Sequence, residues 1–276
     1  KLEFGGMVAD TPGFSSLALE DIEEVELKDY FIEFDKFNDC KFGSKCIHEN
    51  EPNCAIKEAV TNGEISKERY DSYIQLLHEI RQKYSPSLEE KILRELSYVG
   101  LDKSRMKIEI TLEDNYNERG FDDVSFMIST NPGEPLKPLE RVLSGGELSR
   151  IMLALKCVFA DKDEISTLIF DEIDTGISGA VGQRVGEKMY QVSLGHQVLC
   201  ITHLPQIAIL SDHHYFVSKE VVNDKTYTRI RMLSIEDKIN QVASMMGGNG
   251  VTEATIQNVK EMLKFAESKK DEIKNL

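Results

Sequence analysis

Hydrophobic residues recur at helical spacing in the first third of the chain. A short apolar strand is expected near residues 7–9, and from residue 55 the pattern becomes helical, with an interruption at Asn62-Gly63. The second helical run has one apolar face, formed by Tyr70, Tyr73, Ile74, Leu77 and Ile80. The pattern therefore predicts that this part of the chain is mostly helical.

A junction between two pieces is expected at Ser85-Pro86-Ser87. Proline disfavours the helical conformation in the residue before it, so the first helical run should end near Lys83. A serine can cap a new helix, which we expect over residues 88–99. The sequence is thus divided into residues 1–84 and residues 85–276, and little contact is expected across Ser85.

Beyond residue 100 the pattern changes to strands alternating with helices. The expected elements are a hairpin (107–112 and 124–128), a helix (147–160), a strand (167–170), a helix (180–192), a strand (197–201), a hairpin (215–219 and 227–233) and two terminal helices. Strand, helix and strand at this spacing predict parallel strands joined by a crossover helix. The predicted class is α/β with a mixed sheet, preceded by a small, mostly helical domain.

Composition limits the function classes. The 276 residues are 41% hydrophobic and 29% charged, which suits one or two folded cores. The net charge of −15 is spread along the chain, so no broad basic field favours direct contact with nucleic acid. No apolar run is long enough to cross a bilayer, so we expect a cytoplasmic protein with no membrane partner. The start at Lys1 is interpreted as the beginning of a fragment.

A cluster of cysteines and one histidine predicts a structural zinc site in the loop 40–54. Cys40, Cys46, His48 and Cys54 supply three thiolates and one imidazole, the donors of a closed tetrahedral Zn²⁺ site with no open position for water. The alternative is a surface loop of reduced cysteines with a chance histidine. Metal binding would then stabilise the small domain rather than catalyse a reaction.

Residues 1–84 also carry a family resemblance. The stretches 5–17 (GGMVADTPGFSSL), 51–57 (EPNCAIK) and 69–73 (RYDSY) resemble the C-terminal part of RsgA, a family of circularly permuted GTPases acting in maturation of the small ribosomal subunit. The resemblance implies that Asp10 binds Mg²⁺ through water, that the Gly13 amide faces the γ-phosphate, and that the zinc domain contacts ribosomal RNA or the small subunit. Asp-Thr-Pro-Gly is alternatively an ordinary turn.

No phosphate-binding loop accompanies these residues. The sequence contains neither Gly-x-x-x-x-Gly-Lys-Ser/Thr nor the guanine-reading Asn-Lys-x-Asp. We therefore expect the chain alone not to bind GTP.

A second candidate site lies at the ends of two expected strands. Asp171 and Glu172 follow the apolar strand 167–170, and His203 follows the strand 197–201. Ligands bind an open parallel sheet at the carboxyl ends of its strands. Asp171 would hold Mg²⁺ through water, Glu172 would orient and deprotonate the attacking water, and His203 would bind the γ-phosphate or that water.

The stretch Leu143–Glu147 (LSGGE) precedes an amphipathic helix. Gly145 and Gly146 allow a phosphate to approach the backbone closely, and the free N–H groups at the helix start favour an anion. The alternative is a simple helix cap, because Ser144 and Glu147 have capping-box spacing. Ser144, Gly145 and Gly146 are the candidate nucleotide-binding residues here.

Together these motifs resemble the second half of an ABC-type ATPase head. With 174–179 (DTGISG), 202–208 (THLPQIA), 131–139 (NPGEPLKPL) and 243–248 (ASMMGG), residues 85–276 resemble the RecN family of DNA repair proteins. That resemblance implies recombinational repair of double-strand breaks, a relation to the chromosome-structure ATPases, and Mg²⁺ with ATP bound between two heads. The implied partner is an N-terminal RecN-like half or a second head, with DNA contacted only indirectly.

Three interpretations remain open. The chain is a RecN-like ATPase component, an RsgA-like module that binds the small ribosomal subunit, or an artefactual fusion with no autonomous activity. Because no phosphate loop is encoded here, we expect it to be an inactive ATPase by itself. We also expect the sheet to expose a strand edge or an apolar face where a missing half would pack, with self-association as the result.

Overall fold

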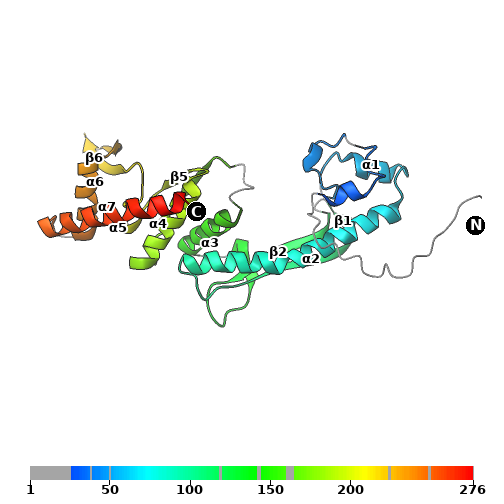
Figure 1. Cartoon of the computed structure of the whole chain (residues 1–276), viewed down its shortest axis with the longest axis horizontal. Helices are drawn as coiled ribbons and strands as arrows, with labels where there is room; N and C mark the ends of the chain where they lie inside the picture. The colour runs from blue at the N-terminus through cyan, green and yellow to red at the C-terminus, as the bar shows by residue number, and fades with distance from the viewer. Residues whose placement is uncertain are drawn as a thin grey trace, which may run out of the picture. The chain divides into compact units, whose positions relative to one another are not determined.

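The computed structural model describes residues 26–37, 39–49, 51–117, 120–141, 144–159, 165–222, 225–247 and 250–275. The chain forms two compact units, coloured in sequence order in Figure 1. The first contains Lys1–Pro86 with Glu109–Ser125, and the second contains Ser87–Ile108 with Phe126–Leu276. Asp10 and Gly13 lie outside the described residues.

One helix, α2 (Lys67–Tyr98), runs through the expected junction. The prediction that helix ends near Lys83 is wrong, because Pro86 lies inside α2. Proline has no N–H to donate to the carbonyl four residues earlier, which is that of Gln82. The hydroxyl of Ser85 donates to that same carbonyl (3.3 Å), which replaces the missing bond and makes proline tolerable here.

The first unit is built on an aromatic core. Its short elements are η1 (Leu27–Tyr30), η2 (Gly43–Lys45) and α1 (Ala55–Thr61), which precede α2. Tyr73 is fully buried and meets the rings of Phe31 and Phe34 edge-on, with centroids 5.1 and 5.0 Å apart. The predicted apolar face of the helix is confirmed, since all five of its residues are buried in this core.

A three-stranded sheet follows α2. Its strands are β1 (Arg105–Asn117), β2 (Gly120–Ser129) and β3 (Lys137–Pro138), in that order across the sheet. The predicted hairpin is confirmed, although its strands are longer than the alternating segments indicated. The pairing of β2 with β3 is antiparallel, and the short η3 (Leu139–Arg141) comes next.

The predicted crossover unit is present in the second compact unit. Its elements are α3 (Gly145–Phe159), β4 (Thr167–Phe170), α4 (Gly179–Ser193), β5 (Gln197–Cys200) and α5 (Pro205–Ala208). Strands β4 and β5 are parallel, with Thr167 opposite Gln197 and Phe170 opposite Cys200. Leu168 and Phe170 point into the core, whereas Ile169, between them, is 68% exposed. One face of this two-stranded sheet is therefore uncovered.

The chain ends with a hairpin and two helices. They are β6 (Tyr215–Val222), β7 (Lys225–Met232), α6 (Ile235–Gly247) and α7 (Glu253–Lys274), and α6 and α7 share a buried cluster of small and branched side chains. Lys238 is buried there and donates to the carbonyl of Ser211 (2.6 Å). Burial, reinforced by the nearby charge of Lys270, lowers the pKa of Lys238 to about 8.

The expected mixed sheet is not found among the described residues. Parallel and antiparallel pairs lie in separate sheets, because α5 and the loop after it stand between β5 and the antiparallel strand β6. No helix in the described part of the chain is long and apolar enough to cross a membrane.

Candidate functional site

Two carboxylates stand at the carboxyl end of β4. Asp171 and Glu172 follow the strand directly, and both are exposed. The Asp171 carboxylate accepts a hydrogen bond from the Glu172 amide (2.9 Å), and the Asp171 carbonyl accepts one from the Ser149 hydroxyl (2.8 Å). Glu172 has φ of 57°, a left-handed conformation that residues other than glycine rarely adopt and that is concentrated at functional sites.

The predicted histidine lies beside these carboxylates' strand, held by an acid that the sequence prediction had given no role. One carboxylate oxygen of Asp174, which is buried, accepts from the Thr202 hydroxyl (2.5 Å) and from the His203 amide (2.8 Å). The same oxygen lies 3.0 Å from Nδ1 of His203, whose side chain is 73% exposed. Asp174 thus joins the loop after β4 to the loop after β5 and fixes the orientation of the imidazole.

The start of α3 packs against the loop that follows β4. A Cβ atom on Gly145 would lie 2.4 Å from a carboxylate oxygen of Glu172, and one on Gly146 would lie 2.9 Å from the Thr175 carbonyl oxygen. Both glycines are therefore required by close approach. The Ser144 hydroxyl accepts from the Glu147 amide (3.4 Å), so the capping interaction is present as well. The structure brings Gly145, Gly146 and Glu172 together.

A buried arginine supports this loop from inside the fold. Arg150 of α3 donates from Nη1 to the carbonyls of Thr175 (2.9 Å) and Ile173 (3.3 Å). Burial lowers the pKa of Arg150. The sequence gave no signal for this role, because an arginine in an amphipathic helix is normally solvent-exposed.

Comparison with known proteins identifies relatives for most of the chain. RecN, the DNA repair protein of Halalkalibacterium halodurans, is 44% identical over 196 residues, which cover 70% of this chain and 35% of that protein. RecN of Bacillus subtilis is 42% identical over 207 residues, covering 70% and 36%. Most of this chain is homologous to RecN. It spans about a third of the length of these curated relatives, and no family model matches it.

A solved structure gives weaker information. The Smc head domain with a coiled coil and joint from Pyrococcus yayanosii aligns with a TM-score of 0.42 at 19% identity, covering 67% of this chain and 35% of that one. A similarity at this level carries no argument about function. The RecN relatives, for their part, do not support the resemblance of residues 1–84 to RsgA, which stays a prediction.

The four predicted metal ligands of the first unit lie together. The donor atoms of Cys40, Cys46, His48 and Cys54 are all within 4.8 Å of one another, and all four residues are buried. The Cys40 and Cys54 sulfurs are 3.9 Å apart, and Nδ1 of His48 lies 3.5 and 3.3 Å from them. A tetrahedral Zn²⁺ with Zn–S of about 2.3 Å and Zn–N of about 2.0 Å requires separations of about 3.8 and 3.5 Å. The cluster fits zinc.

The protonation states also suit a metal. Burial lowers the pKa of His48 to about 4, so the imidazole is neutral, which is the form that binds metal. Burial raises the pKa of the Cys46 and Cys54 thiols. Without a cation these thiols stay protonated in their buried site, and a bound cation would stabilise the thiolates.

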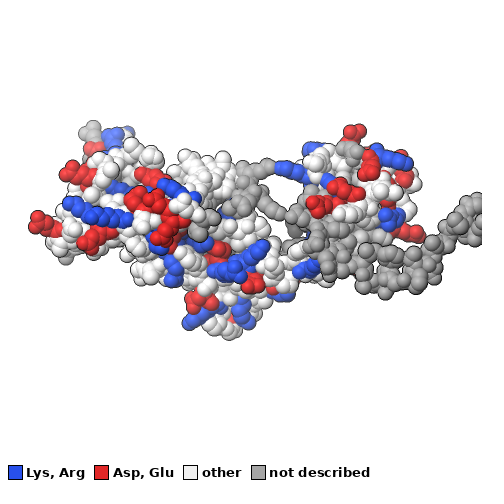
Figure 2. Space-filling model, in the orientation of Figure 1, with Lys and Arg blue, Asp and Glu red and all other residues white. Residues whose placement is uncertain are grey.

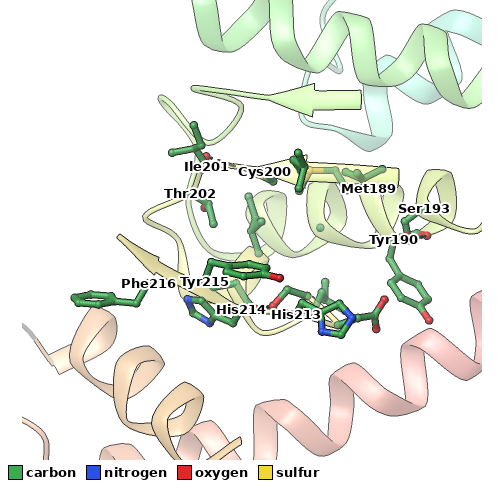
Figure 3. Close-up of a pocket in the computed structure, with 18 of the residues that line it drawn as sticks. Met189, Tyr190, Ser193, Cys200, Ile201, Thr202, His213, His214, Tyr215 and Phe216 are labelled. Carbon is green, nitrogen blue, oxygen red and sulfur yellow. Dashed lines mark hydrogen bonds between the residues drawn. The ribbon is translucent and has the colours of Figure 1, made fainter. Parts of the chain in front are cut away.

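A cavity of about 1070 Å³ opens beside β5 in the second unit (Figure 3). Cys200, Ile201 and Thr202 line one side of it, and His214 and Tyr215, where β6 begins, line the other. The apolar face expected for an incomplete sheet is seen here. Leu199 and Ile201 are 46% and 63% exposed.

Charge is mixed over the surface. On the face drawn in Figure 2, basic and acidic side chains are interspersed. No broad basic field is seen over the described residues on that face, in agreement with the net charge of −15.

Proposed function

We propose that this chain supplies half of the composite ATP site of a RecN-like DNA repair ATPase. The observation that carries the proposal is the joint placement of Asp171, Glu172 and His203 after two parallel, neighbouring strands. Their homology to RecN over most of the chain supports the same assignment. A structure that served only as a scaffold would not need two exposed carboxylates and an oriented histidine at one sheet edge.

Each residue has a role in the proposal. Asp171 would hold Mg²⁺ through water, and Glu172 would orient the attacking water and take its proton. His203, oriented by Asp174, would contact the γ-phosphate or that water. Ser144 and the glycines at the start of α3 would complete the ATP site of a partner head, where backbone N–H groups favour a phosphate.

The rest of the site would come from elsewhere. The sequence printed above has no phosphate loop, so the β-phosphate needs an anchor from an N-terminal RecN-like half or a second head. Strand β5 is the last strand of its sheet, and the cavity beside it separates it from β6. An extended segment could add to this edge and cover Ile169, Leu199 and Ile201. DNA would be contacted through the assembled protein rather than by this chain.

Reconstitution tests the proposal. The full chain would be mixed with the part of Bacillus subtilis RecN that the alignment leaves out, and ATP hydrolysis would be measured with Mg²⁺. We expect hydrolysis only in the mixture, and a loss of about 100-fold or more with Glu172→Gln, because a general base typically contributes that much.

The matched control is Glu261→Gln, which changes an exposed glutamate of α7 in the same chemical way. It should hydrolyse ATP at the unchanged rate. Full activity of the mixture with Glu172→Gln would refute the role of Glu172. A complex that forms but never hydrolyses ATP would refute the composite site.

A second function is favoured by the metal cluster of the first unit. We propose that this unit is an RsgA-like module that binds the small ribosomal subunit, with Zn²⁺ holding its loop 40–54. The cluster geometry supports the zinc site, and the binding partner rests on the sequence resemblance. The zinc-loaded chain should sediment with isolated small subunits, and its absence from that fraction would exclude docking.

The third interpretation concerns the gene rather than the fold. Sequencing messenger RNA across the codon of Ser85 decides whether both segments are made as one polypeptide. A transcript that stops or changes frame there would identify an artefactual fusion.

A further inference from the structure

A buried ionic cluster joins three segments of the first unit. Glu49 follows the predicted metal ligand His48, Arg81 lies in α2, and Asp122 lies in β2. Arg81 donates from Nη2 and Nη1 to the two carboxylate oxygens of Glu49, at 2.6 and 3.0 Å. Its Nη1 also donates to Asp122 (2.6 Å), and the other oxygen of Asp122 lies 2.5 Å from Nδ1 of His78.

The members of this cluster are nearly inaccessible to water. The side chains of Glu49 and Asp122 are 0% and 1% exposed, and that of Arg81 is 16% exposed. One guanidinium therefore neutralises two buried carboxylates at once. Removing one partner of a buried ion pair leaves an uncompensated charge, which is strongly unfavourable. The three side chains are consequently held in place by one another.

Polar contact is what brings Asp122 into this unit. In the described part of the unit, the buried apolar cluster consists of residues between 27 and 80 and contains none from Glu109–Ser125. Little contact was expected across Ser85. That expectation agrees with this apolar cluster but is wrong for the charged side chains.

The path from the metal loop to the hairpin is short. His48 has φ of 60°, so the backbone that carries both His48 and Glu49 is held in an uncommon conformation. The hydroxyls of Tyr70 and Tyr73 donate to the carbonyls of His48 (2.8 Å) and Ile47 (2.5 Å). Fixing the ligand loop with a cation would fix Glu49, and Glu49 in turn positions the arginine that Asp122 requires.

We propose that the metal loop and the β1–β2 hairpin are thermodynamically coupled through Glu49, Arg81 and Asp122, so that Zn²⁺ binding orders residues 109–125. This inference rests on the zinc site of the second proposed function. Coupling is reciprocal, so the hairpin must in turn strengthen Zn²⁺ binding by the same factor. Since β1 and β2 continue into the second compact unit, metal occupancy would be felt in strands that both units share.

Amide hydrogen exchange of the full chain tests the coupling. Exchange would be measured with Zn²⁺ and after chelation in peptides covering 109–117 and 120–125, with α6 as an internal reference. In the wild-type chain, chelation should speed exchange of the hairpin about ten-fold, within the usual range of coupling between sites. In Asp122→Asn the hairpin should exchange fast in both states, and Zn²⁺ should bind about five-fold or more weakly.

Glu90→Gln is the matched control. It removes a carboxylate from an exposed ion pair with Arg94 on the same helix, with both side chains more than 70% exposed. This variant should behave as the wild-type chain. His78→Gln provides a milder change, which keeps the ion pair between Arg81 and Asp122 if Asp122→Asn prevents folding. Its hairpin should still respond to Zn²⁺, but less than the wild type.

The outcomes separate the coupling from the zinc site. Co²⁺ substituted for Zn²⁺ gives thiolate and d–d absorption bands when the four ligands bind it. Absence of these bands would overturn the site and the coupling with it. Bands present with a hairpin indifferent to chelation, or with an unchanged Zn²⁺ affinity in Asp122→Asn, would overturn the coupling alone.

Discussion

Replacement of Asp174 provides a direct test of how the catalytic loop is built. One oxygen of this buried carboxylate accepts from the Thr202 hydroxyl and the His203 amide, and it lies against the His203 ring. Asp174→Ala removes the acceptor and leaves buried donors without a partner. A hydrogen bond to a charged group contributes about 1.5–3 kcal/mol, and such bonds are not additive. We expect Asp174→Ala to lower the free energy of unfolding of the second unit by about 2–4 kcal/mol.

Asp174→Asn separates shape from charge. All three contacts involve a single oxygen, so an asparagine carbonyl can take its place while the charge is lost. This variant should lose about 1–2 kcal/mol. Asp237→Ala is the control, because its ion pair with Arg231 is exposed and 3.4 Å long, and it should cost less than about 0.5 kcal/mol.

The assay must report on the second unit by itself. The chain contains no tryptophan, so urea unfolding is best followed by pulsed amide exchange in peptides that cover β4 and β5. The His203 amide should also exchange faster in both Asp174 variants. A loss below about 0.5 kcal/mol for Asp174→Ala, or equal losses for the two variants, would refute the account of Asp174 as a charged bridge.

Three further predictions follow from individual contacts. Because the folded pKa of Lys238, about 8, lies below the unfolded value of 10.5, the unfolded chain binds more protons between them; from pH 8 to 10.5 the wild type should therefore gain up to about 3 kcal/mol of stability relative to Lys238→Met, and parallel pH profiles would contradict this. Gly146→Ala should destabilise the chain by about 1–3 kcal/mol in urea titrations, because its Cβ would meet the Thr175 carbonyl, whereas Gly195→Ala, with open space around it, should be nearly neutral. Chelation of zinc, or Cys46→Ser, should reduce the circular dichroism signal of the first unit, and an unchanged spectrum would argue against a structural metal.

The sequence alone predicted most local elements and the positions of the candidate residues. Periodicity located the apolar face of α2, the parallel strands β4 and β5 and the terminal helices, because burial of one face imposes a repeat on the residues that form it. The metal ligands were predicted because four soft donors within fifteen positions are rare without a cation to hold. The acids after β4 and the histidine after β5 were predicted because parallel strands present their carboxyl ends together.

Only the tertiary structure decided which distant polar groups meet. Pro86 indicated a helix end, but the Ser85 hydroxyl supplies the hydrogen bond that proline cannot, so α2 continues. Asp174 and Asp122 look like ordinary loop and strand acids, and their burial depends on donors 28 and 41 positions away. A buried charge has no sequence period, because its stability depends on a single partner brought to it by the fold.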